Sequence, residues 1–187
     1  MIDDAMIGRM KRAAQLNVDV YEEVEANPGL NDEARKVVII VAALEGIGVL
    51  LSSLMQGHLV SAIVGGVVIA ALSFGKWYLW SYLTLMVGTK MFGGTSDFGE
   101  ISRTLAYAYT PMGLGVFRFV PGLGGLIAFA GSIWALVTGV VAVRQAMDFD
   151  TTKAILTVVI AGVIAFVVVT VVAAVLFVPL GIGGMMM

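Results

Sequence analysis

The sequence predicts an all-α integral membrane protein: a polytopic bundle of five transmembrane helices, preceded by a short amphipathic N-terminal arm. Of the 187 residues, 59% are hydrophobic and 13% are charged, and the mean hydropathy is +0.98. Soluble proteins are about 45 to 50% apolar, and a soluble core of this size could not hide so much apolar surface. Long apolar runs also alternate with short polar loops, as membrane crossings require.

The composition excludes several functional classes. The absence of cysteine rules out disulfides and zinc–thiolate sites, and the single histidine, His58, rules out a multi-histidine metal centre. A net charge of -2 argues against nucleic acid as a partner. The hydrolase motifs Gly-x-Ser-x-Gly and His-Glu-x-x-His do not occur. We therefore expect neither enzymatic activity nor a cofactor or metal.

Residues 1–36 are predicted to form a cytosolic amphipathic arm. They hold five of the eleven basic and eight of the thirteen acidic residues. Apolar residues recur at helical spacing in 3–15 and in 18–26, and an Asn-Pro-Gly sequence ends the second segment. The arm could lie on the bilayer or on a partner, or it could pack loosely on the bundle. Three glutamates in 18–26 argue against strong adhesion to anionic lipids.

The transmembrane domain is predicted over residues 37–178, with a short tail at 179–187. The first apolar run, Val37 to Met55, rises about 28 Å as a helix and matches a hydrocarbon core of about 30 Å. The run 59–92 would be about 51 Å long, so it crosses either once with an overhang or twice. The five predicted spans are 37–56, 59–80 with an interfacial continuation over 81–92, 103–119, 122–143 and 153–178.

The distribution of charge favours five crossings over six. With five, the loop cations share the side of the N-terminal arm, Lys76 reaches that side, and Arg118 alone lies opposite. With six, seven cations lie inside and four outside, which fits the positive-inside rule less well. The shared loop cations are Lys90, Arg103, Arg144 and Lys153. This arrangement places the N-terminus inside and the C-terminus outside.

The end of the second span has the chemistry of a membrane boundary. Four aromatic residues lie beside Lys76, as in an aromatic belt with a snorkelling lysine. Gly75 precedes the lysine and could instead mark a re-entrant break, which keeps six crossings open. The aromatic residues are Trp77, Tyr78, Trp80 and Tyr82.

Small residues and one proline predict how the spans pack. Pro111 lies inside the third span and is expected to kink it. Small residues at four-residue spacing let helix backbones approach closely, either within one protomer or at a dimer face. These stripes are Gly131, Ala135 and Gly139 in the fourth span and Ala62, Gly66 and Ala70 in the second.

Glu45 is the one acidic residue inside a predicted span, about 12 Å along the helix from Val37. An ionisable group at that depth is a candidate for function, such as proton transfer or substrate binding. It could equally be structural, either protonated or paired with Lys76. The polar and structural candidates as a whole are Glu45, Lys76, Arg103, Tyr107, Tyr109, Pro111, Arg118 and Arg144.

Several segments together resemble one known family. Residues 91–94 read Met-Phe-Gly-Gly, and 103–111 read Arg-Thr-Leu-Ala-Tyr-Ala-Tyr-Thr-Pro after a polar turn. This combination is similar to the central signature of the Yip domain family, the Ypt/Rab-interacting membrane proteins. Residues 133–145 and 151–154 resemble its fourth span and inner loop, and 20–24 resemble a segment of prokaryotic members. The likeness extends from about residue 18 to 178.

The resemblance implies a five-helix bundle with a cytosolic N-terminus. Eukaryotic members lie in endoplasmic reticulum and Golgi membranes, bind prenylated Rab GTPases and act in vesicle traffic or membrane shaping. This chain has no long N-terminal cytosolic domain and no motif of the Asp-Leu-Tyr-Gly-Pro type, so Rab-type GTPase binding is not carried over to it. It resembles the bacterial and archaeal members, which implies a multi-pass protein of the prokaryotic cell membrane.

Two functions remain open at this point. The first is a non-enzymatic scaffold or adaptor of the Yip type that acts on membrane lipids, on other membrane proteins or through self-association. The second is a small transporter or channel subunit that uses Glu45 and Lys76. A polar, water-filled cavity reaching Glu45 would favour transport, whereas a dry, glycine-packed bundle would favour the scaffold.

Overall fold

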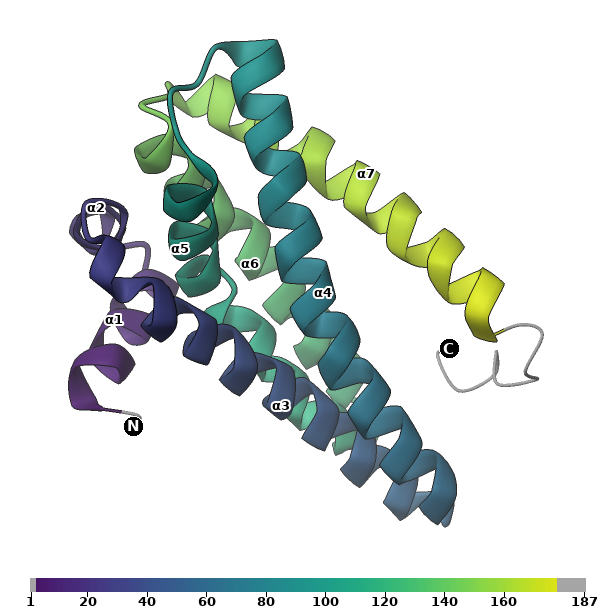
Figure 1. The fold of residues 1–187 in the computed structure, drawn as a ribbon. Helices are drawn as coiled ribbons and strands as arrows, with labels where there is room; N and C mark the ends of the chain where they lie inside the picture. Colours follow the sequence, from purple (N-terminus) through teal and green to yellow (C-terminus); the bar gives the residue numbers. More distant parts are fainter. Residues whose placement is uncertain (1–2, 178–187) are drawn as a thin grey trace.

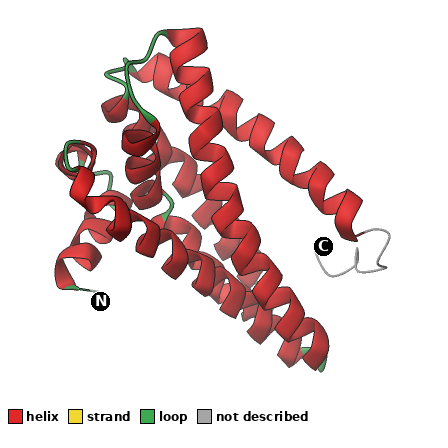
Figure 2. Ribbon diagram, in the orientation of Figure 1, coloured by secondary structure: helices red, strands yellow, loops and turns green. Residues whose placement is uncertain are grey.

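A computed structural model describes residues 3–177, the side chains of Ser61 and 173–177 excepted (Figure 1). Within these residues every regular element is helical (Figure 2). The predicted tail, 179–187, and the last residue of the fifth predicted span, Val178, lie outside them. The elements are α1 (Asp4–Ala14), α2 (Val18–Glu25), the 3-10 helix η1 (Pro28–Leu30), α3 (Asn31–Met55), α4 (Leu59–Phe92), α5 (Phe98–Ala108), the 3-10 helix η2 (Thr110–Phe119), α6 (Gly124–Ala146) and α7 (Thr151–Phe177).

Four helical segments of the described chain are long and apolar enough to cross a membrane. They correspond to the first, second, fourth and fifth predicted spans. They are Pro28–Met55, Ala62–Phe92, Gly124–Ala146 and Thr151–Val172.

The third predicted span, 103–119, is not among these four because its helix changes type. The α-helix α5 ends at Ala108, and η2 begins at Thr110 with Pro111 in its first turn. Proline has no backbone N–H and its ring collides with the preceding turn of an α-helix. The bend expected at Pro111 is therefore a change from α-helix to 3-10 helix.

Helix α4 is continuous over 34 residues and passes Gly75 without a break. The interruption that would let 59–92 cross twice is therefore missing. The helix ends at Gly93, whose φ of 73° lies in the left-handed region that glycine adopts readily. A capping box then starts α5: Asp97 Oδ1 accepts from the Glu100 backbone N–H at 2.9 Å, and Glu100 Oε2 accepts from the Asp97 N–H at 2.9 Å.

Glycines let the central helices touch backbone to backbone. A Cβ atom on Gly46 of α3 would lie 2.6 Å from the carbonyl oxygen of Gly66 on α4, and one on Gly131 of α6 would lie 2.6 Å from that of Pro111. Gly139, about two turns further along α6, faces the Trp80 ring. The small residues that the sequence analysis singled out thus face other helices of the same chain. Ala62 and Ala135 are buried as well.

The loops gather at two ends of the bundle. At one end the turn after α4 meets the turn before α7, where a Cβ on Gly94 would lie 2.9 Å from the Phe149 ring. At the other end lie the turns after α3 and after η2 (Figure 1). Helix α7 starts beside α4 and then diverges from it, as the yellow-green helix in Figure 1 shows.

The N-terminal arm is closely packed, so the expectation of loose packing was wrong. Helices α1 and α2 lie against α5 and α6 (Figure 1). Asp3 and Asn17 cap them, each accepting a hydrogen bond from a backbone N–H three residues on. The arm's apolar side chains have an exposed fraction of 1% or less at Met6, Ala13, Val20, Tyr21 and Val24.

The contact between α3 and α4 can be tested by replacing Gly46 with leucine. The new side chain has no space against the Gly66 backbone, so we expect a loss of about 1 to 3 kcal/mol of stability. Thermal unfolding in detergent would measure it. Gly75→Leu is the matched control, because a Cβ there meets nothing within 4 Å. Equal melting temperatures for the two variants would contradict close packing at Gly46.

Candidate functional site

The structure brings Glu45 of α3 and Lys76 of α4 together. Lys76 Nζ lies 3.8 Å from Glu45 Oε1, and the exposed fractions of the two side chains are 33% for Lys76 and 7% for Glu45. The second carboxylate oxygen of Glu45, Oε2, is buried without a hydrogen-bond partner in the described chain. Gly115 of η2 covers the carboxylate stem, since a Cβ there would lie 3.0 Å from Glu45 Cγ. The pair is therefore closely enclosed on the side of Glu45.

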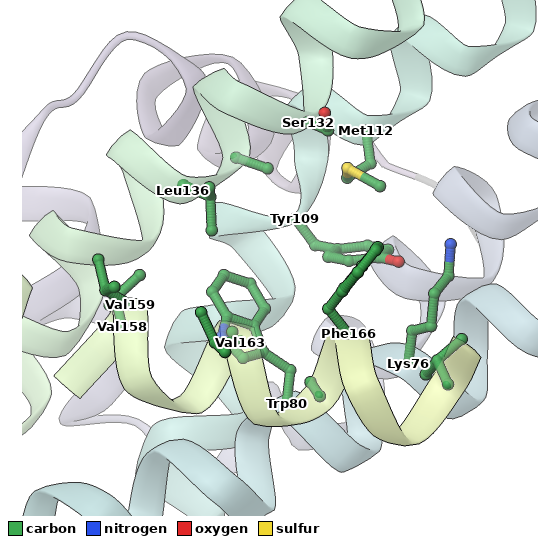
Figure 3. A pocket seen from close by; sticks show the side chains of 14 residues that line it. Lys76, Trp80, Tyr109, Met112, Ser132, Leu136, Val158, Val159, Val163 and Phe166 are labelled. Carbon is green, nitrogen blue, oxygen red and sulfur yellow. The ribbon is translucent and has the colours of Figure 1, made fainter. Parts of the chain in front are cut away.

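Tyr109 adds a hydroxyl near this pair. It lies between α5 and η2, is buried, and donates a hydrogen bond of 3.4 Å to the backbone carbonyl of Ser73 on α4. In Figure 3 the Tyr109 hydroxyl and Lys76 Nζ lie at the same end of a cavity. The side-chain oxygens of Ser73 and Thr110 are buried without partners within residues 3–177.

The cavity itself has a volume of about 440 Å³ and lies between α4, the start of η2, α6 and α7. Its wall is almost wholly apolar, and the polar groups on it come from Lys76, Trp80, Tyr109 and Ser132. Glu45 is not part of the wall. The cavity is therefore not a polar path to the carboxylate. No group of three or more possible acidic, histidine or cysteine ligands for a metal occurs in the described part of the chain.

Arg103 ties α5 to the N-terminal arm. Its guanidinium donates to the carbonyl oxygens of Val24 at 3.1 Å and Glu25 at 2.7 Å, and to Asn31 Oδ1 at 3.0 Å. The residue is only 4% exposed. The sequence analysis treated it as a loop cation, but in the structure it is a buried brace. The fork of N–H donors on arginine suits such a cluster of acceptors.

A second network fixes α1 on the bundle. Arg9 donates to both carboxylate oxygens of Glu33, at 2.8 and 2.7 Å, and Tyr107 donates to the same carboxylate. Glu23 accepts from Arg9 at 3.1 Å and from Arg12 at 2.6 Å. The Arg12 guanidinium, and after it Arg9, holds the pKa of Glu23 below its usual value. The sequence analysis missed the Arg9–Glu33 pair, because no local pattern marks partners 24 residues apart.

Two further contacts join the arm to α6. Trp134 Nε1 donates to the carbonyl of Ala14 at 2.7 Å, and Gln145 Nε2 donates to Glu22 Oε1 at 2.9 Å. We call α1 and α2, together with the turns of α3, α5 and α6 that face them, the head. Of the remaining predicted candidates, Pro111 is buried where η2 starts, whereas Arg118 and Arg144 are exposed and belong to neither cluster.

Replacing Arg103 with methionine is expected to loosen the arm, because the carbonyls of Val24 and Glu25 lose the hydrogen bonds that the guanidinium donates. Hydrogen bonds to a charged group contribute about 1.5 to 3 kcal/mol each. We expect faster amide hydrogen exchange in α2 and faster tryptic cleavage after Lys11 and Arg12. The control is Arg144→Met, which removes the same chemistry from an exposed position. Unchanged exchange in α2 of the Arg103 variant would refute the brace.

Comparison with known proteins identifies one family. A family model described as the Yip1 domain matches residues 20–173, from α2 into α7. Neither a curated protein nor a solved structure matches the chain. The family match covers most of the sequence. It includes Arg103, the pair Glu45 and Lys76, and the residues of the cavity wall, those of α7 among them. The chain therefore belongs to the Yip1 domain family and is an integral membrane protein of the Yip type.

Proposed function

We propose that the chain is a non-enzymatic membrane scaffold or adaptor whose head binds lipids or other membrane proteins. The observation that carries the proposal is the attachment of α1 and α2 to α3 and α5 through Arg103 and through the Arg9–Glu33 pair. A surface that is held in one arrangement beside a membrane suits binding better than turnover. The glycine contacts inside the bundle and the apolar cavity support the same choice.

We further propose five crossings in a prokaryotic cell membrane, with the N-terminus inside and the C-terminus outside. The fifth crossing would be α5 followed by η2, which together lead from the loop end near Phe149 to the turn before α6 (Figure 1). Contact between Gly48 of α3 and Gly115 of η2 supports a path alongside a crossing helix. The cations then keep the distribution that the positive-inside rule favours.

One observation favours a second candidate, a small transporter or channel subunit. The unpartnered Oε2 of Glu45 lies deep in a predicted crossing beside Lys76. Buried ionisable groups of this kind are common on proton and substrate pathways. We rank this function second, because the cavity wall holds few polar groups and does not include Glu45.

Single-cysteine labelling tests the topology, since the natural chain has no cysteine. With five crossings, Cys at Asp19 and Thr95 will be protected from an impermeant maleimide added outside intact cells. Cys at His58 and Leu123 will be labelled. Leu123 is the decisive position: without a crossing by α5 and η2 it would share the side of Thr95. Protection of Leu123 alongside labelling of His58 would rule out five crossings.

Photo-crosslinking tests the scaffold. A photoreactive amino acid at the exposed head positions Lys11 and Asp19 is expected to give discrete protein or lipid adducts in native membranes. The same group at Leu123, at the opposite end, is the control. Arg103→Met should reduce the head adducts, because it loosens the arm. Absence of head adducts, together with proton flux in proteoliposomes that Glu45→Gln abolishes, would replace the scaffold with the transporter.

A further inference from the structure

Helix α1 of the polar arm lies beside the middle of the transmembrane bundle. It contacts η2 as well as α5, and the carbonyl of its last residue, Ala14, accepts a hydrogen bond from Trp134 Nε1 at 2.7 Å. From Gly124, at the far end of the bundle, α6 rises about 15 Å to Trp134. The ten residues of η2 rise about 20 Å from the same end. Both lengths are shorter than a hydrocarbon core of about 30 Å, so α1 lies within reach of the bilayer.

The charges on α1 place it at a membrane surface rather than in the hydrocarbon core. Asp4 and Lys11 are exposed, and a charged side chain in hydrocarbon is costly. Trp134, which contacts α1, is 42% exposed, and tryptophan is enriched where the hydrocarbon meets the headgroups. The membrane surface on the side of the arm therefore meets α6 near Trp134, at the level of α1.

One flank of α1 combines an apolar side chain with a cation. Ile7 is 52% exposed, and Lys11 and Ala14 follow it by four and seven residues, so all three share one face of the helix. Ala14 is the residue that contacts Trp134, and Val137, one turn along α6 from Trp134, is an exposed apolar residue. The flank of Ile7 thus lies next to an apolar surface of a crossing helix.

Other polar groups of α1 are already occupied by protein. Arg9 pairs with Glu33 of α3 at 2.7 Å, and Arg12 pairs with Glu23 of α2 at 2.6 Å. Lys11 lies between these two arginines in sequence but points to another side of the helix, where it is exposed. The cation that α1 offers to an outside partner is therefore Lys11, beside Ile7.

Helix α2 has the opposite character. Its exposed charged residues Asp19, Glu22 and Glu23 are all acidic, and anionic headgroups repel them. Glu22 accepts a hydrogen bond from Gln145 at 2.9 Å. Gln145 lies about 17 Å beyond Trp134 along α6, toward the end of the bundle that faces away from Gly124. Helix α2 therefore lies in water, farther from the bilayer than α1.

We propose that α1 binds the phospholipid headgroup layer on its own side of the membrane. Ile7 would lie against the acyl chains near the headgroups, as the apolar face of an interfacial helix does. The Lys11 ammonium would reach phosphate oxygens on its flexible stem. This inference rests on the proposed head and deepens it, because it makes bilayer lipid the partner of α1 and leaves the acidic face of α2 to other partners.

Nitroxide accessibility tests the position of α1. The chain contains no cysteine, so Ile7→Cys gives one spin label in the full-length protein, reconstituted into vesicles of phosphatidylethanolamine and phosphatidylglycerol. Oxygen concentrates in the acyl region, whereas the nickel complex NiEDDA stays in water. We expect the label at Ile7 to collide more with oxygen and less with NiEDDA than a label in Asp19→Cys of α2. Equal ratios of oxygen to NiEDDA accessibility at the two positions would overturn the proposal.

Two further labels on α1 guard against local distortion. Ala5→Cys is the matched control, since Ala5 is also exposed but lies about 200° around the helix from Ile7, and its ratio should be lower. Lys11→Cys repeats the measurement without altering Ile7 and should give a ratio between those at Ile7 and Asp19. Water-like ratios at both Ile7 and Lys11 would refute lipid binding by α1.

Other outcomes identify other occupants. Low accessibility of the Ile7 label to both oxygen and NiEDDA would show that a second copy of the chain covers this flank, and the proposal would fail. The scaffold is judged separately, by the crosslinking of Asp19. If Ile7 is water-exposed while Asp19 still gives protein adducts, lipid binding by α1 fails and the scaffold stands. If Asp19 gives no adducts while Ile7 has the lipid ratio, the reverse holds.

Discussion

The buried guanidinium of Arg103 is the interaction on which the head depends. It binds two backbone carbonyls at the end of α2 and the side chain of Asn31 at the start of α3. The carbonyls of Val24 and Glu25 lie where α2 ends and have few donors from the helix itself, and the guanidinium supplies one to each. One side chain therefore fixes the arm, α5 and the entry to the first crossing relative to one another. Arg9 of α1 and Tyr107 of α5 both donate to Glu33 of α3, and these bonds form a second link between the arm and the bundle.

Inside the bundle, the glycine contacts and the ion pair between Glu45 and Lys76 have complementary effects. Gly46, Gly66 and Gly131 bring backbones close enough to exclude water and lipid. The charges of Glu45 and Lys76 then lie in a medium of low polarity, where each would be costly alone. Their separation of 3.8 Å gives electrostatic compensation without a close hydrogen bond.

Local features of the fold could be predicted from the sequence, whereas contacts between distant segments could not. The end of α4 at Gly93 and the cap at Asp97 are set by backbone geometry within a few residues. The membrane class is set by composition. The type change after Ala108 was foreseen only as a bend, because proline disrupts an α-helix without dictating the conformation of the residues beyond it. The Arg9–Glu33 pair and the cavity beside α7 depend on how whole helices are placed, and periodicity within one helix carries no such information.

The unbroken course of α4 has a mechanical consequence. The twelve residues from Ser81 to Phe92 add about 18 Å of helix beyond Trp80. Gly88, in this extension, rests against Met147 in the turn before α7, while Trp80 stands in the cavity. The helix is unbroken between Trp80 and Gly88, so this part of α4 moves as one rigid unit. A rotation of α4 at the contact between Gly88 and Met147 would therefore also rotate the indole of Trp80, so a movement at that contact is transmitted to the cavity wall.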